Sequence, residues 1–166
     1  IGIPNHGQLR IGDALTENEI LKFAGIPSFA PELLQSVRAT DPMKAKHLDK
    51  ALNQFAEEGA AKLFKPMIGA GWIIGVVGAL QFEVLASRIE LEYGIPVRFE
   101  QSQFNSARWL SGEKDEIEKF VNVNKGHMAM DHDGDPVYMT RLQWDIDRVE
   151  RDYPNLNLTS TKDIMV

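Results

Sequence analysis

The order of strand-like and helix-like segments between residues 33 and 101 limits the fold of this chain more than any other feature. Apolar periodicity predicts strands at 33–39, 61–66, 72–79 and 95–101, separated by two helices that end near Gly59 and Gly94. The order strand, helix, strand, strand, helix, strand is that of a split βαβ, or ferredoxin-like, unit. We therefore expect an α+β fold with a ferredoxin-like domain at residues 31–104.

Residue types at the start of the first helix support this assignment. Asp41 is a good N-cap, and Pro42 suits the first helical position because it has no N–H to satisfy. Leu48, Leu52 and Phe55 follow at helical spacing. This stripe predicts one buried face, with polar residues on the opposite side.

Residues 105–166 continue with the same mixture of elements. The pattern predicts strands at 106–111 and 156–161, helices at 113–124 and 143–153, and a hairpin at 127–141. We expect these residues to add a further α/β layer, so that one C-terminal α+β domain spans 31–166. Trp109 could stack on RNA, but a tryptophan in a strand favours a core position. We found no short-period repeat.

Residues 1–30 have a different character, with short apolar pieces separated by turn residues. Asn5-His6-Gly7 predicts a hairpin turn, and only two or three strands fit into the segment. Two or three strands cannot close a barrel or cover their own edges. The segment is therefore expected to be the remnant of a β-barrel domain and a crossing to the next domain. Pro27, Phe29 and Pro31 are the candidate residues of that crossing.

Composition excludes several kinds of protein. The formal net charge of −6 argues against a chain that wraps DNA or RNA by general attraction. The sequence has no cysteine, which removes disulfides and thiolate metal sites and fits a cytoplasmic location. The longest apolar run, near residues 72–80, is too short to span a bilayer, and no secretory signal opens the sequence. We expect neither a DNA partner nor a membrane partner.

No motif for GTP hydrolysis is present in the sequence. The glycines at 69, 71, 75 and 78 lack the Lys-Ser/Thr pair of a phosphate-binding loop, and they predict tight turns instead. Asn124-Lys125-Gly126-His127 lacks the carboxylate that reads guanine, and we interpret it as a helix end capped by Gly126. Neither a zinc site nor a Ser-His-Asp arrangement is indicated. We expect no catalytic residue, cofactor or metal in this chain.

Asp131, Asp133 and Asp135 have the spacing of the first three ligands of a calcium loop. The required glycine comes too early, at Gly134, and the twelfth position is Leu142 instead of a glutamate. The pattern therefore favours a solvated hairpin turn.

The first helix carries the candidate ribosome or RNA contact. Lys46, His47 and Lys50 lie away from the apolar stripe and should face solvent. Lys44 and Lys62 could extend this basic face, which could hold a phosphate backbone even on an acidic protein. The alternative is an ordinary solvated helix face, balanced by nearby carboxylates.

Motifs along the whole chain resemble a known family. They are Ile3-Pro4-Asn5-His6-Gly7, Phe23-Ala24-Gly25-Ile26-Pro27, Asp41-Pro42-Met43-Lys44-Ala45-Lys46, Gly75-Val76-Val77-Gly78-Ala79-Leu80 and Glu150-Arg151-Asp152-Tyr153-Pro154. The first resembles the last hairpin of the β-barrel of translational GTPases. The others resemble peptide chain release factor 3. Elongation factor G shares only the weaker outline of the middle segment, and its equivalent region remains an alternative.

The resemblance implies a function in translation termination. Release factor 3 uses GTP to drive class I release factors off the ribosome, and its C-terminal domain reaches the RNA and protein of the small subunit. GTP and Mg²⁺ would bind in an N-terminal domain that is absent from this sequence. A ferredoxin-like module that binds a small metabolite is a further alternative. A small enzyme on this fold, such as an acylphosphatase, lacks its phosphate-cradling loop here.

Overall fold

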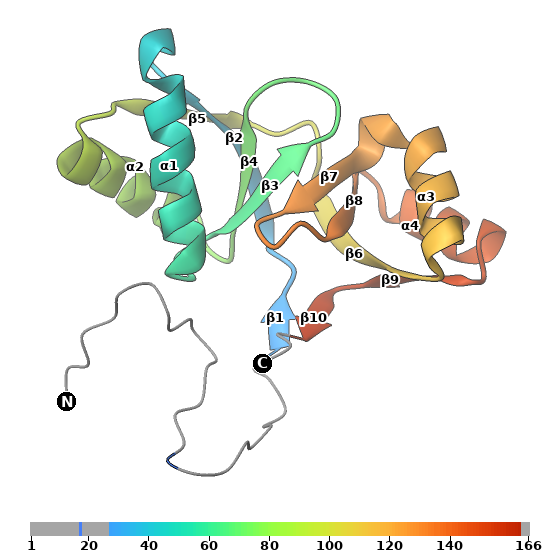
Figure 1. The fold of residues 1–166 in the computed structure, drawn as a ribbon. Helices are drawn as coiled ribbons and strands as arrows, with labels where there is room; N and C mark the ends of the chain where they lie inside the picture. Colours follow the sequence, from blue (N-terminus) through green and yellow to red (C-terminus); the bar gives the residue numbers. More distant parts are fainter. Residues whose placement is uncertain (1–16, 18–26, 164–166) are drawn as a thin grey trace.

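The computed structural model describes residue 17 and residues 27–163 (Figure 1). The predicted N-terminal hairpin and short strand therefore lie outside the described residues. The first elements are β1 (Pro27–Phe29), β2 (Leu33–Ala39), the 3-10 helix η1 (Pro42–Lys44), α1 (Ala45–Glu57), β3 (Lys62–Pro66), β4 (Trp72–Val76), α2 (Leu80–Tyr93) and β5 (Val97–Gln101). The remaining elements are β6 (Ser106–Gly112), α3 (Lys114–Val123), the 3-10 helix η2 (Lys125–His127), β7 (Met128–Asp131), β8 (Pro136–Thr140), α4 (Gln143–Asp152), β9 (Leu156–Thr159) and β10 (Thr161–Asp163).

Most strands form one eight-stranded sheet with the order β5-β2-β4-β3-β7-β8-β6-β9, in which all neighbours are antiparallel. β1 and β10 pair separately as a two-stranded ribbon. The predicted α+β class is confirmed. Figure 1 shows α1 and α2 near one end of the sheet and α3 and α4 near the other.

The sheet has an internal two-fold arrangement that the sequence did not reveal. The first half, residues 33–101, has the order β-α-β-β-α-β, and the second half, residues 106–159, repeats this order. Across the sheet, the first half has the order β5-β2-β4-β3 and the second half has the corresponding strands in reverse, β7-β8-β6-β9. Residues 106–159 are thus more than an added layer, because they repeat the topology of residues 33–101.

The strand registers of the two halves correspond residue by residue. Leu33, which begins β2, lies opposite Val76 at the end of β4, and Ser106 at the start of β6 lies opposite Thr140 at the end of β8. The last residue of β2 faces the first residue of β5, and the last residue of β6 likewise faces the first residue of β9. The repeat therefore extends to the hydrogen-bond pattern.

The seam between the halves is the pairing of β3 with β7. Lys65 lies opposite Met130, and the pairs Phe64–Asp131 and Pro66–Ala129 lie on either side of it. The approximate two-fold axis therefore passes near Lys65 and Met130. β3 would otherwise be an open edge of the first half and β7 an open edge of the second half, and their pairing covers both.

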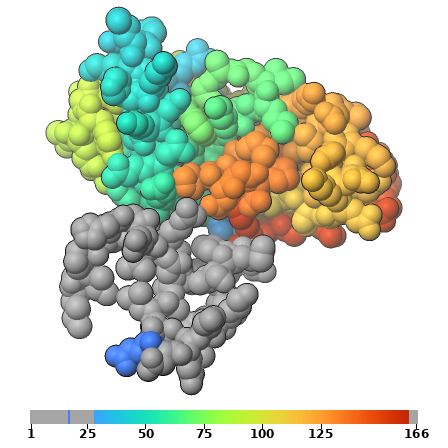
Figure 2. All heavy atoms as spheres, viewed as in Figure 1, coloured from blue at the N-terminus to red at the C-terminus, as the bar shows by residue number. Residues whose placement is uncertain are grey.

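Three groups of buried side chains stabilise this arrangement. One packs under α1 and α2 and a second under α3 and α4. The third lies on the other face of the sheet and contains residues of both halves, among them Phe64 and Trp109. Trp109 is buried, at 6% exposed, so the predicted core position is confirmed. Figure 2 also shows the β7–β8 turn, in orange, beside the teal C-terminal part of α1, where His132 Nδ1 lies 3.4 Å from Asn53 Oδ1.

Element ends follow the predicted cap residues in most places. The Asp41 side chain accepts a hydrogen bond of 2.9 Å from the Met43 N–H, but the first turn is 3-10 and α1 begins at Ala45. Gly94 ends α2 with φ of 64°, a left-handed conformation that suits glycine. The prediction of Gly126 as a helix cap is wrong. Asn124 ends α3, and its side-chain amide donates to the Phe120 carbonyl.

Candidate functional site

The outer face of α1 presents three basic side chains. Lys46, His47 and Lys50 are exposed, and they point away from the buried Leu48 and Leu52. Within the described part of the chain, none of the three basic groups makes a hydrogen bond or an ion pair. We call these three residues the basic helix face. Their basic groups are therefore available to a partner.

Lys44 and Lys62 are not part of this face. The Lys44 ammonium donates a 2.6 Å hydrogen bond to the Gly94 carbonyl and so satisfies the C-terminal end of α2. The Lys62 ammonium donates to the hydroxyl of Ser28 in β1. Burial lowers the pKa of Lys62, and the nearby Lys162 ammonium lowers it further. The sequence pattern did not distinguish these two engaged lysines from the exposed ones.

One side of α1 borders an open groove of about 350 Å³. Trp72 lines it, and its indole N–H donates a 2.5 Å hydrogen bond to Asp49 of α1. The Lys65 ammonium lies 5.3 Å from the centroid of the Trp72 ring. The indole of Trp72 thus holds the Asp49 carboxylate at the groove, where it remains one negative charge beside the basic helix face.

The crossing segment is held by main-chain and packing contacts. Ser28 pairs with Lys162 and Phe29 with Thr161 in the β1–β10 ribbon. Pro31 then packs against Gly75 of β4, where an added Cβ would lie 2.4 Å from Pro31 Cγ. Where the chain enters the domain, Pro31 therefore leaves no room for a side chain at position 75. The phenyl ring of Phe29 remains largely exposed.

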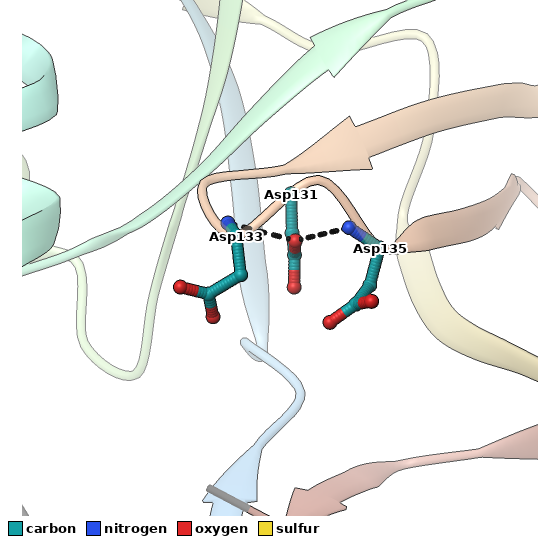
Figure 3. A group of neighbouring side chains, drawn as sticks. All are labelled: Asp131, Asp133 and Asp135. Atoms are coloured by element: carbon teal, nitrogen blue, oxygen red, sulfur yellow. Dashed lines mark hydrogen bonds between the residues drawn. The ribbon is translucent and has the colours of Figure 1, made fainter. Parts of the chain in front are cut away.

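Lys162 of β10 is the centre of a charged cluster on the β7–β8 turn, of which Figure 3 draws the three carboxylates. Its ammonium lies 2.8 Å from Asp131 Oδ2 and 2.7 Å from Asp133 Oδ2, and it also contacts Asp135. The side chain is only 19% exposed. Burial alone would lower the pKa of Lys162, but its hydrogen bonds to the three carboxylates raise the pKa well above its usual value.

The turn itself is built around Asp131. Its Oδ1 accepts the backbone N–H groups of Asp133, at 3.0 Å, and of Asp135, at 2.8 Å (Figure 3). Its Oδ2 accepts the indole N–H of Trp109 at 2.9 Å. The three carboxylates are close enough together to hold a metal ion, but the ammonium of Lys162 lies among them. We call these four residues the Lys162 cluster.

Sequence reasoning identified the three aspartates but not their partner. Lys162 lies 27 or more positions further along the chain, since Asp135 is the last of the three aspartates. Lys162 reaches the turn as part of β10, which pairs with β1. No local signal in the sequence could have indicated this contact.

Comparison with known families identifies the domain. The family model described as class II release factor RF3, C-terminal domain, matches residues 23–150. The match covers most of the chain, and the chain therefore belongs to the RF3 C-terminal domain family. The family takes part in protein biosynthesis, at translation termination. Among the described residues, no helix is long and apolar enough to cross a membrane.

Proposed function

We propose that this chain is the ribosome-engaging part of a release factor 3, which uses GTP to promote the departure of class I release factors after termination. The match to the RF3 C-terminal domain carries this proposal. GTP and Mg²⁺ would bind in an N-terminal GTPase domain of the full-length, cytoplasmic protein. This part would contribute binding and no catalysis.

The direct partners would be RNA and protein of the small ribosomal subunit. The exposed Lys46, His47 and Lys50 support this, because their basic groups have no protein partner among the described residues. Local positive potential attracts phosphates even when the net charge of the protein is negative. Class I release factors would be affected indirectly, through the ribosome.

We further infer that each half is a ferredoxin-like unit and that residues 31–166 act as one stiff body. The repeated β-α-β-β-α-β order and the corresponding registers support this inference. Residues 1–30 would be the end of a β-barrel domain and the crossing. The Pro31–Gly75 contact and the Lys162 cluster would then fix the angle between barrel and arm.

The test uses the full-length factor and purified ribosomes. Lys46→Glu with Lys50→Glu is expected to weaken binding and to reduce the dependence of log affinity on log salt by about one for each phosphate that the variant no longer neutralises. Lys114→Glu with Lys119→Glu on α3 is the matched control, since it changes the net charge equally. Equal affinity and salt dependence for both double variants would contradict the assignment of the basic helix face.

One observation favours the alternative of a small-molecule module. The open groove beside Trp72 has a volume of about 350 Å³, which is enough for a small metabolite. A thermal-shift screen with amino acids and nucleotides separates the two functions. A ligand that raises the melting temperature, and that fails to do so after Trp72→Ala, would favour the module.

A further inference from the structure

A second surface, at the other end of the sheet, combines an exposed aromatic ring with basic side chains. Trp144 lies in the first turn of α4 and is 59% exposed, whereas Trp109 is buried. A tryptophan that leaves most of its area in water gives up a large stabilising contribution from burial. The exposed ring of Trp144 is available to a partner.

The ring of Trp144 is accompanied by a guanidinium group. The Cζ atom of Arg148 lies 5.1 Å from the centroid of the Trp144 ring. The only acidic partner of Arg148 among the described residues is Asp145, at 3.8 Å, and Asp145 also accepts a 2.6 Å hydrogen bond from Thr140. At 3.8 Å, Asp145 compensates the charge of Arg148 only loosely.

Two further cations lie near the same end of β8. Arg141 follows β8 directly and is exposed, and Lys125 is exposed in η2. Neither side chain makes an ion pair within residues 27–163. We call Trp144, Arg148, Arg141 and Lys125 the tryptophan-arginine surface. The other acidic group on this part of α4, Asp147, accepts a hydrogen bond from Gln143.

Main-chain contacts hold these residues in place. The backbone N–H of Asn105 donates to the Thr140 carbonyl at 2.9 Å, and its side-chain amide reaches the Arg141 carbonyl at 3.3 Å. His127 Nδ1 lies 3.0 Å from the Met139 carbonyl, so η2 is fixed against the end of β8. The backbone that carries Arg141 and η2 is thus fixed, which lowers the entropic cost of ordering it on binding.

We propose that the tryptophan-arginine surface binds unpaired RNA, with a base stacked on Trp144 and the flanking phosphates held by Arg141, Arg148 and Lys125. Base stacking on an aromatic ring next to cationic groups is how proteins hold single-stranded RNA. Arg141, Arg148 and Lys125 outnumber the two carboxylates of this surface, Asp145 and Asp147, and a local excess of positive charge favours a polyanion. The proposal deepens and rests on the proposed function, since the ribosome would supply the RNA.

The first measurement is the affinity of the full-length factor for a short fluorescein-labelled single-stranded RNA, followed by anisotropy at several salt concentrations. Trp144→Ala is expected to lower the affinity about tenfold, and Trp144→Phe to retain most of it, because phenylalanine still stacks. Arg141→Glu should lower the affinity and reduce the salt slope by about one. The matched duplex RNA should bind more weakly than the single strand, and Lys119→Glu serves as a charge control.

Unchanged affinity of the Trp144→Ala and Arg141→Glu variants for the single strand would overturn the proposal. Weaker binding of both variants to ribosomes, with unchanged binding to RNA, would indicate a protein partner and would equally overturn it. If both variants lose affinity for RNA and the wild-type factor does not bind ribosomes, the RNA surface would be supported and the proposed function contradicted. Both residues are exposed, so far-ultraviolet circular dichroism should show folded variants.

Discussion

The ammonium of Lys162 lies 2.8 Å from Oδ2 of Asp131, and this contact joins the last described strand to the turn between β7 and β8. The Asp131 side chain is only 9% exposed, and it also supports the turn backbone and the Trp109 indole. One lysine thus connects the β1–β10 ribbon with the second half of the sheet.

Removing this lysine should destabilise the domain. Lys162→Met leaves three neighbouring carboxylates without their cation, and Asp131 cannot turn to water. We expect the free energy of unfolding to fall by about 2 kcal/mol, as when a partly buried charged group is deprived of its partner. Urea unfolding measures the change.

The matched control for this substitution is Lys119→Met. Lys119 pairs with Glu116 on the exposed side of α3, where an ion pair contributes less than about 1 kcal/mol. Two variants of equal stability would mean that the Lys162 cluster does not hold the ribbon. A second change, Asp135→Asn in the Lys162→Met background, should restore part of the stability, because it removes one of the repelling charges and leaves the hydrogen bonds of Asp131 in place.

The same cluster predicts a dependence on alkaline pH. The folded state raises the pKa of Lys162 above the ordinary value near 10.5, so the folded state retains this proton more tightly than the unfolded chain does. Its contribution is fully present below that ordinary value and declines as the pH rises beyond it. The stability difference between wild type and Lys162→Met should therefore be constant from pH 8 to 10 and shrink above about pH 10.5. A difference that grows in this alkaline range would contradict the assignment.

Calcium should have little effect on the wild-type protein. The carboxylates of Asp131, Asp133 and Asp135 already surround the Lys162 ammonium, and a divalent cation would have to displace it. We expect the melting temperature to stay the same after addition of millimolar CaCl₂, with MgCl₂ at equal ionic strength as the control. A rise specific to calcium would show that the turn binds the ion in place of Lys162.

The close contact of Pro31 with Gly75 predicts a steric effect. Gly75→Ala would place a methyl group 2.4 Å from Pro31 Cγ and 3.1 Å from Phe64 Cε2. We expect a decrease of about 2 kcal/mol in the free energy of unfolding, the usual size of an overpacking effect. Gly78→Ala is the control, because its added Cβ would meet no atom within 4 Å. If Gly75→Ala is as stable as the wild type, the crossing segment moves to accommodate the methyl group without a loss of stability.

The sequence predicted the local part of this fold well. Apolar periodicity located α1 and α2, and Asp41 and Gly94 act at their ends as their chemistry suggests. The strand predicted at 72–79 stops earlier, at Val76, because the N–H groups of Val77 and Gly78 both donate to Gln81 Oε1. Such a side-chain cap is decided by three-dimensional placement and is not visible in an apolar pattern.

Long-range features could not be predicted from the sequence. The repeat is a correspondence of strand register and topology, whereas the aligned side chains differ: Leu33 corresponds to Ser106, and Trp72 to Pro136. α1 and α3 also differ in length, with 13 and 10 residues. The exposure of Trp144 depends on the turn before α4, since a helix pattern alone does not say which side chains remain uncovered.

The pairing of β3 with β7 also bears on how such a chain could arise. A single β-α-β-β-α-β unit with a free edge would pair with a second copy around a two-fold axis, as homodimers do. A covalent connection through residues 102–105 makes that partner permanently available at high effective concentration. Because the two halves differ in sequence, one end of the molecule carries basic side chains on α1 while the opposite end carries an exposed indole.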